Sequence, residues 1–354
     1  MLAAMPEPSR ACTEARLKAE DGAVAVGRSM EFAQIINSNV IVQPRGQKNV
    51  STLPDGKDGI KWTSKYGVMY LDGFGIDIAV DGMNETGLSM GALFFPGEAQ
   101  YQEMKGAKPS RTMVINDLPL YILQNFSTVD EVREALPKLT VVGINTPAMG
   151  NIVIPTHLSV YEPGGNGIII EYTKAGLNIY DSVGIMTNSP AYPWHVTNMR
   201  NYVGLTSENV EPIVIDGVSF AATGQGSGLN GIPGDPTPPA RFIRAAAMAY
   251  LAAKTDNAQG AVNLALHIMN TVDIPLGTVR DFDDKESFGD YTQWVVAKDL
   301  TNRVLYFRTY DNMSLRAVDM KKFDMSEGAE RFTMPVDGGE GAVTDVTAEL
   351  TAAN

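Results

Sequence analysis

The sequence predicts an α+β fold built on antiparallel sheets. Two observations predict this class. Strand-like segments follow one another in pairs joined by tight turns, and they do not alternate with helices. Two helices expected at residues 238–248 and 261–272 would form a separate helical layer. Residues 12–335 are expected to form a single domain, preceded by a removable leader at residues 1–11 and followed by a flexible tail at residues 336–354.

The first predicted element of the domain is a hairpin. Apolar and polar residues alternate along residues 13–20, which is the period of a half-buried strand. An Asp-Gly pair at residues 21–22 supplies the positive φ angles of a tight turn, and residues 23–29 form the returning strand. Antiparallel pairing of the two strands is expected to bring the Arg28 guanidinium close to the Cys12 thiol.

The remaining elements are predicted from periodicity and turn residues. Ser127 is expected to cap a helix with Asp130 at the capping-box position, so the acids there are structural. Residues 33–75 are expected to be mainly loops, with one short strand at residues 68–70. The other expected elements are strands at residues 76–80, 88–94, 151–154, 157–161, 167–172, 183–186, 294–297 and 304–307, and helices at residues 117–125, 127–136, 238–248 and 261–272.

Composition and residue spacing argue against several classes of function. A net charge of −13 argues against binding to nucleic acid or to an anionic membrane surface. No run of 18 apolar residues occurs, so no membrane insertion is expected. The glycine-rich residues 224–228 lack the Lys-Ser/Thr ending of a phosphate loop, and the acids at residues 281–286 lack calcium-loop spacing and predict a solvated loop. We therefore expect no metal and no cofactor.

The only cysteine, Cys12, is the main candidate for chemistry. A single thiol cannot form an internal disulfide and is too few for a cysteine-rich zinc site, so it is either an inert small hydrophobe or a nucleophile. Cys12 lies where the leader ends and the first strand begins. A cysteine freed at that point can use its own α-amine as general base, and a nearby Arg28 cation favours the thiolate.

A histidine-assisted mechanism has less support. The chain has three histidines, His157, His195 and His267, and none of them lies in a protease signature or in a metal-binding spacing. All three are expected to be structural. His195 follows the turn at Asn188 and can line a site there, but it is not the expected base.

Four blocks of sequence occur in a set order along most of the chain. They are Cys12-Thr13 with Asp21-Gly22 and Gly27-Arg28-Ser29-Met30-Glu31, then Asp81 to Gly97, then Thr187-Asn188-Ser189-Pro190, and finally Gly231 to Phe242. In this order they resemble the choloylglycine hydrolase and penicillin V acylase family, a branch of the N-terminal-nucleophile hydrolases. The resemblance implies a four-layer αββα sandwich, with two antiparallel sheets between helical layers. It also implies hydrolysis of a non-peptide linear amide through a thioester.

The resemblance further implies roles for individual residues. The Asn188 side chain is the expected donor to the oxyanion, and a proline-stiffened turn holds such a donor in place. Glu31 stands where the family usually carries an aspartate that contacts the nucleophile, and Arg241 matches the family's second arginine. The expected catalytic residues are Cys12, Arg28, Glu31, Asn188 and Arg241, with Met30 and Phe94 at the oxyanion and substrate pocket, where Phe94 offers its backbone N–H.

The substrate is expected to be a small amide. Penicillin-cleaving relatives tend to have an aromatic residue at the place of Phe94, and bile-salt-cleaving relatives an asparagine. Phe94 and an exported origin therefore favour penicillin V or an N-acyl homoserine lactone. A conjugated bile salt is the alternative substrate, and a non-catalytic binding protein that retains its leader is the alternative of another class.

Location and assembly are also predicted. Residues 2–4 resemble the end of a signal peptide, which predicts a periplasmic or secreted protein, with the cytoplasm left as the other compartment. In relatives the region matching residues 207–230 packs against a neighbouring subunit. The resemblance therefore implies a homo-oligomer, either a tetramer or a dimer.

Overall fold

A computed structural model describes residues 11–280, 289–339, 341, 344, 346 and 347. Most of the strands belong to two sheets, one with six strands and one with eight, and every strand pair inside these two sheets is antiparallel. Most of the predicted leader and the acids at residues 281–286 lie outside the described residues.

The six-stranded sheet carries the predicted N-terminal hairpin at its centre. Its strand order is β16-β1-β2-β19-β20-β21, and β2 is buried along its whole length. The turn after β1 contains Gly22 at φ 89°, as the Asp-Gly signal predicts. The strands are β1 (Cys12–Lys18), β2 (Val24–Phe32), β16 (Ile185–Met186), β19 (Tyr291–Asp299), β20 (Val304–Thr309) and β21 (Arg316–Asp319).

The eight-stranded sheet packs against the first and has the order β15-β14-β13-β8-β7-β6-β3-β22. Its strands are β3 (Asn39–Gln43), β6 (Val68–Gly73), β7 (Ile76–Asn84), β8 (Ser89–Phe94), β13 (Thr156–Tyr161), β14 (Gly167–Thr173), β15 (Gly176–Asp181) and β22 (Phe332–Pro335). Smaller two-stranded pairs are formed by β4 (Lys48–Thr52) with β5 (Asp58–Thr63), β9 (Thr112–Val114) with β10 (Thr140–Val142), β11 (Asn145–Thr146) with β12 (Ile152–Val153), and β17 (Ile213–Ile215) with β18 (Val218–Phe220).

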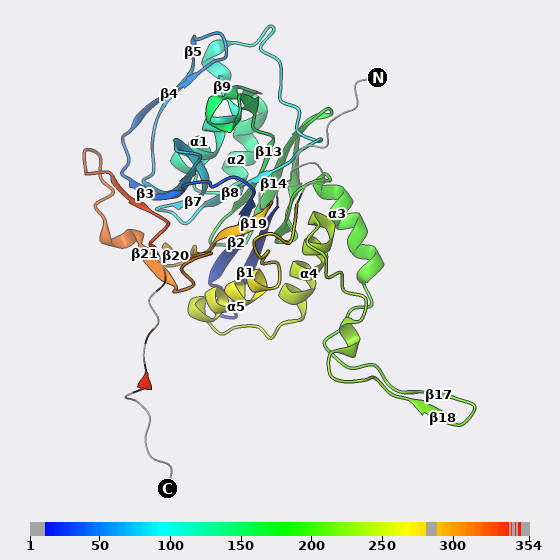
Figure 1. The fold of residues 1–354 in the computed structure, drawn as a ribbon. Coiled ribbons are helices and arrows are strands. Elements are labelled where there is room, and N and C mark those ends of the chain that lie inside the picture. The colour runs from blue at the N-terminus through cyan, green and yellow to red at the C-terminus, as the bar shows by residue number, and fades with distance from the viewer. Residues whose placement is uncertain (1–10, 281–288, 340, 342–343, 345, 348–354) are drawn as a thin grey trace.

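Helices cover the outer faces of both sheets, so the expected four-layer αββα sandwich is confirmed (Figure 1). Helices α4 (Pro238–Leu251) and α5 (Ala258–Asn270) pack on the six-stranded sheet, and α1 (Leu118–Asn125) packs on β7 and β8 of the other sheet. Helices α2 (Val129–Ala135) and α3 (Tyr192–Asn198) complete the set of α-helices in the described residues. No helix among these residues is long and apolar enough to cross a bilayer.

A glycine in β2 lets α5 approach the sheet. A Cβ atom placed at Gly27 would lie 3.0 Å from the Cβ of Ala265, which is closer than ordinary van der Waals contact. This close contact fixes α5 against the strand that carries Arg28 and Glu31. The main apolar core fills the space between the two sheets and the space under α4 and α5.

Two local predictions differ from the structure. The helix cap is Thr128, whose hydroxyl accepts from the Glu131 N–H at 3.2 Å, so the capping box lies one residue later than predicted from Ser127. Residues 33–75 contain β3, β4 and β5 in addition to β6. The β3 sequence is a short apolar run without alternation, as expected for a strand buried on both faces.

Candidate active site

The predicted site residues come from five separate elements that meet at the N-terminal end of β1. Cys12 begins β1, Arg28, Met30 and Glu31 lie on β2, and Phe94 ends β8. The other two contributors are Asn188, in the loop after β16, and Arg241, in the first turn of α4. All of these side chains are buried.

Strand alternation sends these side chains to two faces of the six-stranded sheet. Cys12 pairs with Met30 and Glu14 pairs with Arg28, so these four side chains lie on the face toward the eight-stranded sheet. Glu31 comes one residue after Met30 and therefore points to the opposite face, where the α4 helix lies.

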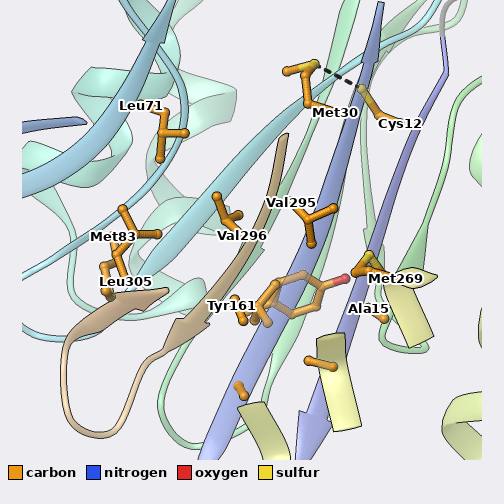
Figure 2. Packing of buried hydrophobic residues seen from close by; sticks show 14 of the residues in the cluster. Cys12, Ala15, Met30, Leu71, Met83, Tyr161, Met269, Val295, Val296 and Leu305 are labelled. Atoms are coloured by element: carbon orange, nitrogen blue, oxygen red, sulfur yellow. Dashed lines mark hydrogen bonds between the residues drawn. The ribbon is translucent and has the colours of Figure 1, made fainter. Parts of the chain in front are cut away.

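Cys12 is 2% exposed, and its thiol lies between the Met30 thioether and the Arg28 guanidinium. Its Sγ is 3.5 Å from the Met30 sulfur (Figure 2) and 3.8 Å from Nη2 of Arg28. Burial raises the pKa of the thiol above its ordinary value, and the Arg28 charge acts in the opposite direction. Arg28 is therefore the group that offsets the cost of forming a thiolate at this buried position.

Arg28 is held in place by three oxygen acceptors in addition to its contact with the Cys12 sulfur. Its Nη2 donates to the Ala92 carbonyl at 2.6 Å, and its Nη1 donates to Asp81 at 3.1 Å and to the Val80 carbonyl. Burial acts to lower the pKa of Arg28, but the charges of Cys12 and Asp81 outweigh burial and hold it above its ordinary value. The guanidinium thus stays charged beside the sulfur.

Asn188 contacts both the nucleophile and Arg241. Its Oδ1 accepts from the Cys12 backbone nitrogen at 2.7 Å and from Nη2 of Arg241 at 2.7 Å. Arginine can only donate, so the amide oxygen must face Arg241, and Nδ2 must face the Phe94 carbonyl, 2.8 Å away. Arg241 also donates to the Thr13 hydroxyl at 2.6 Å and to the Cys12 carbonyl. Arg241 therefore fixes the Asn188 amide and the start of β1 together.

Two buried histidines hold the backbone on either side of Asn188. His157 Nε2 lies 2.9 Å from the Thr187 carbonyl, and its Nδ1 lies 3.0 Å from Glu171. His195 Nε2 donates to the Asn188 carbonyl at 2.8 Å, and burial lowers the pKa of His195 to about 4, so this ring is neutral at pH 7. Both histidines position the turn, in agreement with their expected structural role.

An apolar cavity opens beside the Cys12 sulfur and has about 550 Å³ of empty space including its mouth. Its wall includes both predicted pocket residues, Met30 and Phe94, and also Phe32 and Phe74. The Phe94 ring contacts the Phe32 ring edge to face, with centroids 6.1 Å apart. An apolar cavity lined by Cys12 suits an apolar acyl group whose carbonyl carbon reaches the thiol.

Comparison with known proteins agrees with this geometry. Residues 12–338 match the family described as linear amide C–N hydrolases, choloylglycine hydrolase family. The chain belongs to this family. It is 36% identical over 315 residues to a bile salt hydrolase/transferase of Clostridium perfringens, a match that covers 88% of this chain and 93% of the relative.

Solved structures of choloylglycine hydrolases and acylases share the fold. A conjugated bile acid hydrolase variant from Clostridium perfringens superposes with a TM-score of 0.82 at 31% identity, and the match covers 95% of this chain and all of the other. A penicillin V acylase from Agrobacterium tumefaciens gives a TM-score of 0.74 at 25% identity, with 91% and 90% of the two chains covered. This member of the choloylglycine hydrolase family is thus a hydrolase of linear amide C–N bonds.

The Glu31 side chain makes no hydrogen bond to the nucleophile among the described residues. The Glu31 backbone N–H donates to the Ala11 carbonyl at 2.9 Å, and its Oε1 accepts from the Thr292 hydroxyl at 2.9 Å. Its Oε2 is buried without a hydrogen-bond partner among the described residues. The contact of Glu31 with the nucleophile therefore stays a prediction.

Glu31 makes the stability of this hydrolase depend on pH. Burial raises the pKa of its carboxyl from 4.5 to about 7, although Arg241 opposes the effect. The folded state therefore favours the protonated acid, and this stabilisation is complete below pH 4.5 and is lost as the pH rises through about 7. Relative to Glu31→Gln, the wild type should lose about 3 kcal/mol of unfolding free energy between pH 4.5 and pH 8.

Urea unfolding of both proteins across this pH range measures the difference. The exposed Glu20→Gln serves as control and should follow the wild type at every pH. If the free energies of unfolding of the wild type and Glu31→Gln differ by the same amount at every pH, the raised pKa of the Glu31 carboxyl is contradicted.

Several residues that shape the site were not predicted from the sequence. Thr292 contacts Glu31, Asp81 contacts Arg28, and Glu171 contacts His157. Thr292 and Asp81 lie 261 and 53 residues from their partners, whereas Glu171 comes from the strand that follows His157. The described residues contain no cluster of histidine, cysteine and acidic side chains that could hold a metal ion.

Proposed function

We propose that this family member hydrolyses the amide bond of conjugated bile acids with Cys12 as an N-terminal nucleophile. The observation that carries the substrate is the apolar cavity that has Cys12 in its wall. A steroid acid is a rigid apolar acyl group, and a cavity lined by aromatic and aliphatic side chains favours burying it. Relatives named bile salt hydrolases align over most of the chain, which supports this substrate over penicillin V.

The proposed reaction begins when residues 1–11 are removed and the Cys12 nitrogen becomes an α-amine. The amine takes the thiol proton, and the thiolate attacks the carbonyl carbon of the amide. The carbonyl oxygen becomes an oxyanion and accepts a hydrogen bond from Asn188 Nδ2. The C–N bond then breaks, the amine leaves with the proton of the α-ammonium, and water hydrolyses the thioester to release the acid and the thiol.

Arg28, Arg241 and Glu31 support this reaction without bonding to the substrate carbonyl. Arg28 favours the thiolate from 3.8 Å, and Arg241 holds the Asn188 amide in its donating orientation. The buried Oε2 of Glu31 is the acceptor that we assign to the α-ammonium, because the carboxylate lies within electrostatic range of Cys12 and Arg241.

Penicillin V or an N-acyl homoserine lactone is the second candidate substrate, and one residue favours it. The Phe94 ring forms part of the cavity wall and carries no side-chain amide to offer a polar substrate group. An aromatic wall packs well against a flat ring or a flexible acyl chain. The comparisons support this candidate less strongly than the bile-acid substrate.

Amine release from three substrates distinguishes the two candidates. We expect the highest kcat/KM on a glycine- or taurine-conjugated bile acid, with lower values on penicillin V and on an acyl homoserine lactone. A higher kcat/KM on penicillin V would favour the second candidate. Hydrolysis of none of the three by a processed enzyme would overturn both substrate proposals and leave the reaction class intact.

We also propose that the protein is a homo-oligomer assembled through the β17–β18 hairpin. The hairpin projects from the body of the molecule (Figure 1), and its apolar side chains are more than half exposed. These side chains are Ile213, Val214, Ile215, Val218 and Phe220. Such an apolar patch on a projecting element is typical of a protein contact.

Charging the hairpin should dissociate the oligomer. The double change Val214→Glu and Phe220→Glu places two carboxylates on the apolar patch, and the cost of burying them opposes association. Light scattering should then give the mass of a monomer, whereas the wild type gives a multiple of it. Tyr250→Glu, at a side chain 85% exposed on α4, is the control and should leave the mass unchanged. An unchanged mass for the hairpin variant would contradict this assembly.

A further inference from the structure

A cluster of four charged side chains lies between the two sheets directly behind Arg28. Glu14, Arg28 and Lys298 come from the six-stranded sheet, and Asp81 comes from β7 of the other sheet. All four side chains are fully buried. Because burying a charge is costly unless it is paired, two cations and two carboxylates form a neutral set in this layer.

Lys298 is the centre of this cluster. Its Nζ lies 2.9 Å from the Asp81 carboxylate, 3.3 Å from Glu14 and 3.5 Å from the Met90 carbonyl, so each of its three protons has an acceptor. Glu14 also accepts from the Ser159 hydroxyl. None of these contacts is used in the reaction described above.

The cluster reaches the nucleophile through Arg28. Asp81 accepts from Arg28 Nη1 on one side and from Lys298 on the other, so it divides its negative charge between two cations. Arg28 Nη2 is then turned to the Cys12 sulfur. Without Lys298, the Arg28 cation would face two carboxylates alone, and less of its positive charge would act on the sulfur.

We propose that Glu14 and Lys298 are positioning residues that control, through Asp81 and Arg28, how readily Cys12 forms its thiolate. Lys298 neutralises Asp81 and leaves the Arg28 charge to the sulfur, and Glu14 balances Lys298. The inference rests on the proposed role of Cys12 as nucleophile and adds two residues that lie outside the substrate cavity.

The other charged residues around Cys12 are left unsubstituted in the variants that test this proposal. Glu31 on β2 and Arg241 on α4 act on Cys12 directly, and Asp273 and Asp290 act on that pair from the opposite face of the sheet. None of them contacts Glu14 or Lys298 through a hydrogen bond or ion pair among the described residues. Changes at Glu14 and Lys298 therefore probe the buried cluster alone.

The test follows alkylation of Cys12 by iodoacetamide as a function of pH in the purified enzyme. Cys12 is the only cysteine, so the modified mass reports this thiol alone. Lys298→Met leaves an excess negative charge and should raise the midpoint of alkylation by about one pH unit, which is about a tenfold loss of thiolate below the midpoint. Glu14→Gln leaves an excess positive charge and should lower the midpoint.

The double variant Lys298→Met with Glu14→Gln restores a neutral cluster and should return the midpoint to that of the wild type. Because its cluster is neutral, the double variant should fold and can be measured even if the unpaired carboxylates left by Lys298→Met destabilise the single variant. Lys18→Met, at an exposed position on β1, is the control and should match the wild type.

Opposite shifts in the two single variants, cancelled in the double variant, cannot arise from a purely structural role, which would lower stability in both. Equal midpoints in all variants, or shifts in the same direction, would overturn the proposal. Alkylation needs no substrate, so this outcome is separate from the tests of amide hydrolysis.

Discussion

Replacing Cys12 by alanine is expected to abolish amide hydrolysis completely. The proposed reaction forms a thioester on the Cys12 sulfur, and no other cysteine exists in the chain to take its place. The other groups at the site, such as Asn188 and Arg241, bind and stabilise but carry no nucleophile. Amine release from each substrate should fall to the uncatalysed background.

Folding should survive this change. Cys12 is a small buried residue at the end of β1, and Cys12→Ala removes only its sulfur, so the free energy of unfolding should fall by about 2 kcal/mol at most. Circular dichroism and urea unfolding provide the check. Cys12→Ser is the matched control for polarity, and it should also lose nearly all turnover because a serine hydroxyl is far less acidic. Turnover in folded Cys12→Ala at more than background would contradict the thioester mechanism.

Replacing Asn188 by alanine is expected to lower kcat by about 10²–10³. The Asn188 amide is fixed by Arg241 on its oxygen and by the Phe94 carbonyl on its nitrogen, so its second N–H is preorganised as an oxyanion donor. Loss of that donor removes an interaction that strengthens in the transition state. KM should change much less than kcat.

Ser189→Ala is the matched control for Asn188. Ser189 follows Asn188 in the same turn, and its hydroxyl donates to the Pro96 carbonyl at 2.6 Å, away from the sulfur. This variant should keep kcat within about threefold of the wild type, because the Ser189 hydroxyl bonds to Pro96 and supplies no donor to the oxyanion. Equal losses in Asn188→Ala and Ser189→Ala would mean that the turn matters only for its conformation.

The N-terminal part of the site could be predicted because its signals are local. An Asp-Gly turn and the alternation around it place Cys12 and Arg28 on paired strands, and the structure has this hairpin. The convergence of Asn188 and Arg241 on Cys12 was expected only from the resemblance. Their contacts join positions 176 and 229 residues apart, and no local pattern specifies them.

The contacts made by each face of the central strands were harder to predict from the sequence. Alternation places Glu31 and Arg28 on opposite faces of β2, but the partners of each face depend on which layer packs there. Lys298 occupies an inward position of β19, and its acceptors lie on β1 and β7. The pairing of two sheets that decides such contacts is a tertiary property.

One missed element did carry a local signal. Ile213–Ile215 and Val218–Phe220 flank an Asp-Gly turn in which Asp216 and Gly217 have φ angles of 49° and 81°. This is the sequence of a tight hairpin, but it lies in a stretch rich in glycine and serine that also suits a loop.

The proposed role of Cys12 is tested most directly by intact mass and N-terminal sequencing of enzyme that is shown to release amine from its substrate. The mechanism requires a free Cys12 α-amine, so active enzyme should begin at Cys12 and lack residues 1–11. Active enzyme in which Cys12 is still joined to Ala11 would contradict the N-terminal-nucleophile mechanism. A chain that retains residues 1–11 and is inert on every substrate would instead favour an unprocessed precursor or a binding protein.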